Sequence, residues 1–206
     1  RPRVKRAWAA FIRAKIGNQA ACLRLAGMGE FELLESLRRR VRSGDAGRLE
    51  GQAAAHYFPR LLGRGFDRSQ ESWSNAALDY GYAILRGAIT RCLVAHGLLP
   101  SIGLFHSSEQ NAFNLADDLI EPFRPLVDLH VVRLLQASVQ SRTELQHEDK
   151  VGLVSLLNVD VRMPQGEMST LAAIEHSVES IQRLLEGDDG GEVLALPTII
   201  GLRRHV

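Results

Sequence analysis

The feature that most constrains the fold is a hydrophobic pattern with helical spacing along almost the whole chain. Near the start of the chain it runs through Trp8, Phe11, Ile12, Ile16 and Leu23. Side chains at these intervals share one face of a helix, so this segment is predicted to form one long helix. Because the pattern continues beyond it, the chain is predicted to be all-α, a compact multi-helix domain.

Glycine and proline residues divide the rest of the chain into further segments. Asp45 is placed to cap a helix that carries Glu50, and Gly97 stands where the end of a helix favours a positive φ. Pro122 and Pro125 are expected to interrupt a helix. The helices expected after the first cover about 30–43, 46–58, 70–96, 111–121, 143–157 and 169–186, with a basic loop near 59–68 and another loop over 98–110.

The length of 206 residues, 45% of them hydrophobic, allows one sizeable core, so residues 1–206 are expected to form one domain. The sequence opens at Arg1 and reads as helix at once. We therefore expect it to be part of a larger protein. Residues 187–191 form a polar break, and the tail within 187–206 is expected either to pack in extended form or to be loosely packed.

The two cysteines and the length of the apolar runs indicate in which cellular compartment the protein is expected. Cys22 and Cys92 lie in apolar helical patterns, without the spacing of a zinc site or of a secreted disulfide scaffold. No apolar run reaches the roughly 18 to 20 residues that span a bilayer, and no segment resembles a signal peptide. We expect a cytoplasmic protein that does not enter a membrane.

Charge is distributed unevenly along the chain. The net charge of +1 argues against a simple electrostatic nucleic-acid binder, yet residues 1–68 hold 15 of the 25 Lys and Arg residues and 6 of the 24 Asp and Glu residues. This basic part could contact phosphates, and the acidic remainder could hold cations. The alternative is an ordinary solvated helix face, which charge alone favours. The candidate DNA-binding residues are Arg38, Arg39, Arg40, Arg42, Arg60, Arg64 and Arg68.

Residues 117–124 read Asp-Asp-Leu-Ile-Glu-Pro-Phe-Arg and crowd three carboxylates. Asp118 and Glu121 lie three residues apart on one helix face, with Asp117 beside them, and like charges at this spacing repel each other. A bound cation would relieve that repulsion. The alternative is that Arg124 pairs with Glu121 and that solvent screens the other carboxylates.

Two further residues allow both a structural and a functional interpretation. His106 ends an apolar run just before a polar loop, and Glu50 stands among glycine and alanine residues, where it would be partly buried and need a partner. Either side chain can be a metal ligand or a satisfied structural residue. The remaining histidines show no ligand spacing of their own: His56, His96, His130, His147, His176 and His205.

Several segments together resemble the CRISPR-associated integrase family that acquires new spacers, in the branch found beside single-protein RNA-guided effector nucleases. They occur in order from about Trp8 to Asp128: Lys15-Ile16-Gly17-Asn18-Gln19-Ala20, Glu50-Gly51 with Tyr57-Phe58, the segment from Asn75 to Leu85, and the segment from Asn111 to Pro125 with Val127-Asp128. Two positions depart from the family pattern. Asp79 stands where asparagine is usual, and Phe105 stands where a second histidine is common.

The resemblance implies an active site and a reaction. Glu50, His106 and Glu121 would hold the catalytic metal, with Asp118 as an additional candidate ligand. Two carboxylates and one imidazole suit Mn²⁺, or Mg²⁺ with extra waters. The implied activity is that of a divalent-metal-dependent DNA endonuclease and integrase of antiviral adaptive immunity, in which a DNA 3′-hydroxyl attacks a phosphodiester of the CRISPR repeat.

The resemblance also implies partners. They are double-stranded DNA, as prespacer and CRISPR repeat, a second copy of the intact protein in a homodimer, and a small CRISPR adaptation protein. The family carries an N-terminal β-rich domain, and the resemblance begins near the start of this sequence, so we expect these residues to correspond to the C-terminal catalytic domain. Two alternatives remain at this point: a non-catalytic helical DNA-binding or assembly module, and a different hydrolase that shares helical metal ligation.

Overall fold

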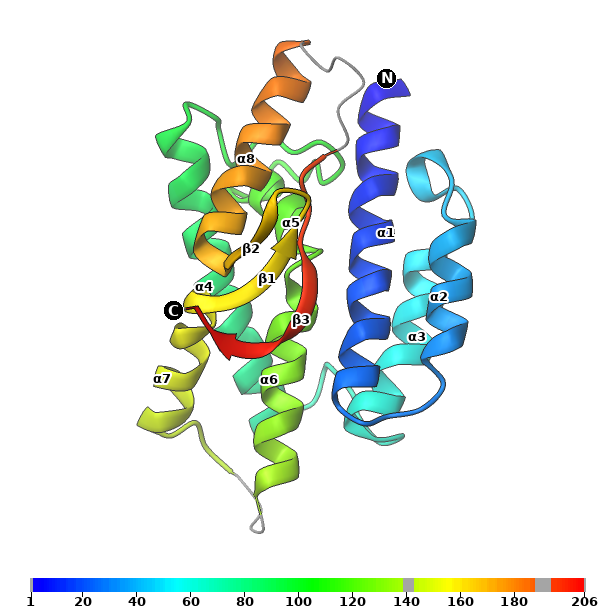
Figure 1. The fold of residues 1–206 in the computed structure, drawn as a ribbon, viewed down its shortest axis with the longest axis vertical. Coiled ribbons are helices and arrows are strands. Elements are labelled where there is room, and N and C mark those ends of the chain that lie inside the picture. The colour runs from blue at the N-terminus through cyan, green and yellow to red at the C-terminus, as the bar shows by residue number, and fades with distance from the viewer. Residues whose placement is uncertain (1, 139–142, 188–193, 206) are drawn as a thin grey trace.

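The computed structural model describes residues 2–138, 143–187 and 194–205, and eight α-helices and three strands lie in these ranges (Figure 1). The helices are α1 (Pro2–Leu25), α2 (Phe31–Arg40), α3 (Leu49–Leu62), α4 (Trp73–Ala95), α5 (Asn114–Ile120), α6 (Arg124–Ala137), α7 (His147–Ser155) and α8 (Thr170–Glu186), with short 3-10 turns η1 (Ser43–Asp45) and η2 (Leu156–Asn158). The strands are β1 (Val159–Met163), β2 (Gly166–Ser169) and β3 (Thr198–Arg204). None of the helices in these ranges is long and apolar enough to cross a membrane.

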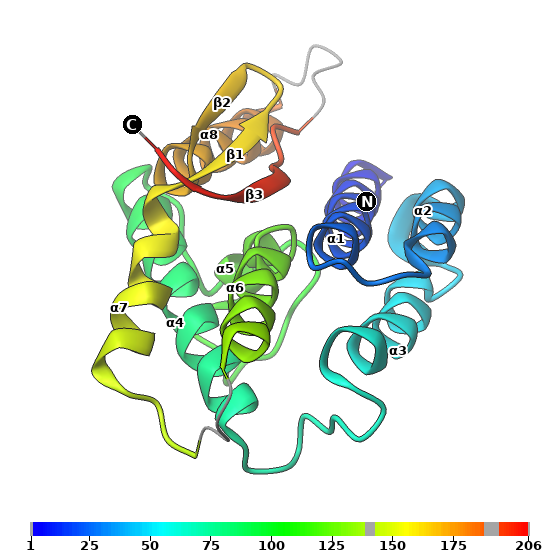
Figure 2. The same ribbon diagram turned by 60° about the horizontal axis from the view of Figure 1, so that its bottom comes forward.

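The long helix α1 lies between two groups of elements. α2, η1 and α3 pack against one side of it, and α5, α6 and β3 contact it from the other (Figures 1 and 2). The five apolar residues that predicted this helix are all buried in the core. The predicted first helix is therefore confirmed, and its buried stripe joins the two halves of the molecule.

The predicted helix boundaries are largely confirmed. The carboxylate of Asp45 accepts hydrogen bonds from the backbone N–H groups of Leu49, at 2.9 Å, and Glu50, at 3.0 Å, and so caps α3 as expected. Gly97 has a φ of 73° directly after α4. The break at Pro122 is present, but the expected interruption at Pro125 is wrong: this proline lies in the first turn of α6, where its missing N–H costs no helical hydrogen bond.

The all-α prediction is wrong in one respect, because the C-terminal part contains a small antiparallel sheet with strand order β2-β1-β3. β1 pairs with β2 from Asp160 opposite Ser169 to Met163 opposite Gly166. β3 forms the other edge of the sheet. This part of the tail therefore packs in extended form, which was one of the two alternatives expected from the sequence. The polar break predicted at 187–191 falls, after Gly187, on residues outside the described ranges.

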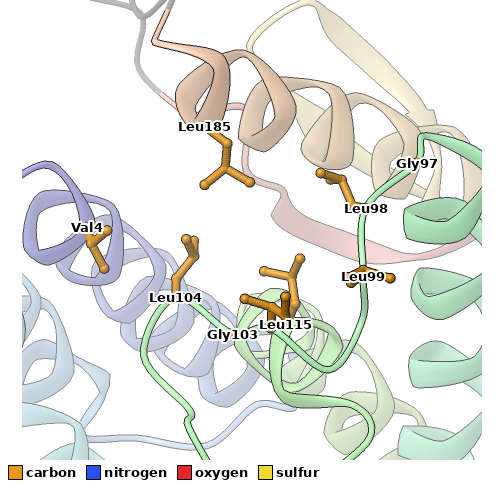
Figure 3. A pocket seen from close by; sticks show the side chains of 9 residues that line it. Val4, Gly97, Leu98, Leu99, Gly103, Leu104, Leu115 and Leu185 are labelled. Carbon is orange, nitrogen blue, oxygen red and sulfur yellow. The ribbon is translucent and has the colours of Figure 1, made fainter.

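A pocket of about 590 Å³ opens between the start of α1, the loop after α4 and the end of α8 (Figure 3). Its lining consists of apolar side chains and glycines, among them Val4, Leu104 and Leu185. Such a lining offers no group for acid-base or metal chemistry. The chemistry of the chain is therefore concentrated elsewhere.

Candidate active site

Lys15, in the middle of α1, joins two of the predicted site residues. Its Nζ lies 2.6 Å from Oε1 of Glu50, in the first turn of α3, and 2.5 Å from Oε2 of Glu121, just after α5. The side chain of Lys15 is 13% exposed and that of Glu121 is 7% exposed. The two carboxylates that were predicted to share a metal cation thus share a lysine ammonium group.

The charges at this point stabilise one another. Burial works to lower the pKa of Lys15, but the carboxylates of Glu121 and Glu50 outweigh it and raise the pKa. Burial likewise works to raise the pKa of Glu121, but Lys15 and Arg124 lower it. Arg124 Nε donates to Glu121 Oε1 at 3.0 Å, which is the pairing considered as an alternative from the sequence. At neutral pH, Glu121 is therefore ionised and Lys15 is protonated.

A cavity of about 210 Å³ lies beside these groups. It is lined by Lys15, Gln19, Phe58, Arg68, Tyr82, Glu121, Arg124, Pro125 and Asp128. Arg68 donates to Asn75 Oδ1 at 2.8 Å and pairs with Asp79. The cavity combines three basic side chains with two carboxylates, so it can accept an anionic group next to Glu121.

Sequence reasoning missed Lys15 as a member of this site, although it considered Arg124 as a partner of Glu121. Lys15 opens one of the segments that carry the family resemblance, and Arg124 lies three residues after Glu121. The lysine could have been found from that signal. Its contact with Glu50 and Glu121 could not, because it depends on how three separate helices pack.

His106 lies in the loop between α4 and α5 and is fixed by Asp118. Its Nδ1 is 2.7 Å from Oδ1 of this fully buried carboxylate. The backbone N–H groups of Leu104, Phe105 and His106 donate to the same carboxylate at 2.6, 3.0 and 3.1 Å. A carboxylate accepts hydrogen bonds, so Nδ1 is the donor here, and in the neutral ring Nε2 is then the nitrogen available to a ligand.

Trp8 and Gly103 shape the same loop. The indole ring of Trp8 stacks on Phe105, with ring centroids 4.1 Å apart and planes 3° apart, and meets His106 edge-on at 5.8 Å. Phe105 thus anchors the loop from the position at which a second histidine is common in the family. A Cβ on Gly103 would lie 2.2 Å from the carbonyl oxygen of His106, so only glycine fits this turn.

The three predicted ligands do not all meet in one place. Glu50 and Glu121 meet at Lys15, whereas His106 bonds to Asp118. Among the described residues, one His/Cys/Asp/Glu triple has all its ligand atoms within 4.8 Å of one another, and it is a different one. The convergence of Glu50, His106 and Glu121 on one metal therefore stays a prediction. The ammonium group between two carboxylates indicates a position that accepts a cation, and the free Nε2 of His106 adds a suitable nitrogen donor.

The predicted DNA-binding arginines differ in how far they are already paired. Arg60 pairs with Glu30, and Arg38 Nη1 lies 3.1 Å from Glu35. By contrast, the exposed side chains of Arg39, Arg40 and Arg42 form no ion pair within the described residues, and they line one pocket with Gly47 and Gln52. Unpaired exposed guanidinium groups bind phosphate most readily.

The fold places the chain in a structural class. It resembles a casposase bound to integration product, with a TM-score of 0.72 and 22% identity over 91% of this chain and 62% of that chain. It also resembles a Cas1 protein from Thermotoga maritima, with a TM-score of 0.68 and 18% identity over 91% of this chain and 69% of that chain. At such identities the likeness defines the helical fold that casposase and Cas1 structures share.

The sequence narrows this class to one family. The family model described as CRISPR associated protein Cas1 matches residues 3–162. The CRISPR-associated endonuclease Cas1 of Neisseria meningitidis serogroup C (strain 8013) is 42% identical over 99% of this chain and 67% of its own length. A Cas1 endonuclease of Francisella tularensis subsp. novicida (strain U112) is 26% identical over 88% of this chain and 64% of its own length. The chain belongs to the Cas1 family and spans about two thirds of these relatives.

Proposed function

We propose that this chain is the catalytic part of a divalent-metal-dependent DNA endonuclease and integrase that inserts short foreign DNA segments into a CRISPR array. The observation that carries the proposal is that the carboxylates of Glu50 and Glu121 meet at the ammonium group of Lys15. A cavity lined by Arg68 and Arg124 lies beside them. Family membership supports it, because the Neisseria relative is named an endonuclease. The casposase of the same fold is bound to an integration product.

Glu50, His106 and Glu121 are the residues that would hold Mn²⁺ or Mg²⁺. When bound, the cation would polarise the scissile phosphate and stabilise charge on the attacking and leaving oxygens. Asp118 was considered as a further ligand, but its oxygens accept four hydrogen bonds from the loop and from His106. Its proposed role is to orient His106 so that Nε2 faces away from the bonded carboxylate.

The chain's own cationic residues would bind and orient the DNA phosphate. Lys15, Arg68 and Arg124 line the cavity at Glu121 and can neutralise a phosphodiester there. The 3′-hydroxyl oxygen of one strand would bond to phosphorus while the bond to the leaving 3′-oxygen breaks. The attacking hydroxyl would lose its proton to solvent, and the leaving oxygen would take one up, so that no net proton is released. Water in place of the hydroxyl group would give hydrolysis. Neither version needs a covalent bond to the protein.

The remaining partners follow from the same proposal. Arg39, Arg40 and Arg42 would hold the duplex backbone, and preference among sequences would come largely from DNA shape. Solved complexes titled Cas6-RT-Cas1–Cas2 share this fold, which supports a small CRISPR adaptation protein as partner. A homodimer of the intact protein and action in the cytoplasm, where the array lies, complete the proposal.

The substitution His106→Ala tests the catalytic role. Cleavage of branched DNA in Mn²⁺ should be abolished, because the substitution removes the proposed nitrogen ligand. Helical circular dichroism and DNA affinity should stay close to those of the unmodified chain, since His106 lies in a loop. The matched control is His147→Ala, at the exposed start of α7, which should cleave normally.

Full cleavage by the His106→Ala variant would remove this histidine from the site. If the unmodified chain binds DNA but never cleaves it in Mn²⁺ or Mg²⁺, the alternative of a non-catalytic DNA-binding module is correct instead.

A further inference from the structure

A second group of potential metal ligands lies where α4 meets α8. His96, directly after α4, and Glu175 and Glu179, on α8, offer one ligand atom each, and these atoms all lie within 4.8 Å of one another. The two helices are in contact, and Figure 1 shows α8 against α4. None of the three residues lines the cavity beside Glu121. The group is therefore separate from the candidate active site.

The ring of His96 is already oriented as a ligand. Its Nδ1 lies 2.9 Å from the backbone carbonyl oxygen of Cys92, one turn earlier in α4. A carbonyl oxygen only accepts hydrogen bonds, so Nδ1 is the donor, and in the neutral ring Nε2 then holds the lone pair. Metal-binding histidines typically donate their other N–H to a carbonyl or carboxylate in this way, which fixes the tautomer before the metal arrives.

The two glutamates place two carboxylates close to His96. They lie four residues apart on α8, where like charges repel each other. Glu179 Oε2 lies 3.2 Å from His176 Nδ1, and within the described ranges neither glutamate pairs with a Lys or Arg side chain. A divalent cation would neutralise this pair.

We propose that His96 Nε2 and the carboxylates of Glu175 and Glu179 form a Zn²⁺ site that fastens α8 to α4. Zinc binds both imidazole nitrogen and carboxylate oxygen, and a site with three protein ligands leaves the fourth position to water. Zinc binds mixed sites of nitrogen and oxygen ligands more tightly than manganese does. Because Glu50, His106 and Glu121 offer the same types of donor, Zn²⁺ would also compete for the candidate active site, and the two sites are told apart by their variants. The ligand atoms must approach to roughly 2.0 to 2.2 Å from the ion, which rotation of the two glutamate side chains on the helix surface allows.

The site would be specific to the folded chain. His96 and Glu175 lie far apart in the sequence, so the three ligands meet only when α8 is packed on α4. A cation that binds the folded state alone raises stability by mass action. Zinc would therefore stabilise the attachment of α8, and with it the sheet that follows η2. The separation in sequence also explains why the histidine spacing gave no sign of a site.

The test compares zinc binding by the unmodified chain with that of a Glu175→Gln, Glu179→Gln double variant. Calorimetry with ZnCl₂ should show one fewer Zn²⁺ per chain in the double variant, or an affinity at this site weakened by more than roughly 100-fold. The rise of the melting temperature with Zn²⁺ should shrink accordingly. Co²⁺ provides a second readout, because its visible absorption on binding at this site should disappear.

Matched variants separate this site from others. Glu71→Gln with Glu148→Gln removes two exposed carboxylates elsewhere and should bind zinc like the unmodified chain. Glu50→Gln with Glu121→Gln removes the candidate active site and should retain the Zn²⁺ of the α4–α8 site. Equal zinc stoichiometry and affinity in the Glu175→Gln, Glu179→Gln variant and the unmodified chain would overturn the proposal. None of these readouts depends on DNA cleavage.

Discussion

At the scale of single residues, Asp128 has the most unusual environment. It is 2% exposed and accepts hydrogen bonds from the phenol groups of Tyr57, at 2.9 Å, and Tyr82. Burial raises its pKa to about 6, although both phenols and Arg124 act to lower it. The guanidinium of Arg124 also lies 4.6 Å from the ring centroid of Tyr82. Asp128 therefore supports the wall of the cavity that contains Glu121.

The raised pKa of Asp128 makes folding stability depend on pH. Its folded pKa of about 6 exceeds the ordinary value of 3.8, so the folded state holds this proton more tightly than the unfolded state. The contribution is favourable below pH 4 and is lost as pH rises towards 6, by up to roughly 3 kcal/mol. Asp128→Asn, which cannot ionise, should remove this loss.

The measurement is urea denaturation of both chains between pH 4 and 7. The difference in the free energy of unfolding should shift in favour of Asp128→Asn as pH rises. Glu121, whose lowered pKa acts in the opposite direction, is present in both chains and cancels in the difference. A difference that stays constant over this range would show that the Asp128 proton is not linked to folding.

At the scale of elements, the contact between α4 and α6 depends on one glycine. A Cβ on Gly81 would lie 2.4 Å from Cγ1 of Val127 and 3.1 Å from Cδ2 of Leu153. The missing side chain lets α6 lie against α4, with Tyr82 of α4 bonded to Asp128 of α6. Close helix packing at Gly81 thus brings the cavity wall together.

Gly81→Ala should destabilise the chain by about 1 to 3 kcal/mol, because the added methyl group overfills this contact. In Gly81→Ala with Val127→Ala, the loss should be smaller than the sum of the two single losses, since the shortened valine makes room. Gly87→Ala is the control on the same helix: its Cβ meets no atom within 4 Å, and it should stabilise slightly. Thermal denaturation of the four variants measures all three effects, and strict additivity would refute the close contact.

The elements also show what the sequence could predict. α1 and α4 present apolar stripes over several turns, and this periodicity sufficed to predict them. β1 has five residues and follows directly on the helical segment α7–η2, so the alternation of Val159, Val161 and Met163 with polar residues was too short to stand out. Its pairing with β3 joins segments far apart in the chain, which no local pattern encodes.

The candidate site was predictable to a different degree. Glu50, His106 and Glu121 were assigned through the family resemblance, because each alone has an ordinary structural interpretation. The resemblance could not reveal that Lys15 lies between the two glutamates. Nor could it reveal that the carboxylate of Asp118 accepts hydrogen bonds from His106 and from the loop that carries it. Both facts depend on tertiary packing rather than on residue type or spacing.

At the scale of the whole molecule, α1 links the basic surface to the carboxylate site. Asn18 donates to the carbonyl oxygens of Pro122, at 2.7 Å, and Pro197, at 2.9 Å, and accepts from the N–H of Ile199 at 3.1 Å. The turn after α5 and the start of β3 are thereby held beside Lys15. The same helix carries the arginine-rich end of α2, because Arg38 packs over Gly17.

The basic surface should contribute to DNA affinity separately from the chemistry. Arg39→Ala with Arg40→Ala should weaken binding and lower the slope of log affinity against log salt by about 1.8, as expected for two lost phosphate contacts. Arg91→Ala with Lys150→Ala removes the same charge from exposed positions on α4 and α7 and should leave the slope nearly unchanged. The measurement is the DNA affinity of each variant across a series of salt concentrations. Equal slopes for the two double variants would place the DNA surface elsewhere.

The ammonium of Lys15 has a consequence for how such a protein is made. The carboxylates of Glu50 and Glu121 have their counter-charges from Lys15 and Arg124, both encoded in the chain itself. Newly synthesised chains can therefore complete this part of their core while manganese or magnesium is scarce. If Glu50 and Glu121 hold the metal as proposed, folding of this part would not depend on metal supply, and the folded chain would gain activity once a cation displaced Lys15.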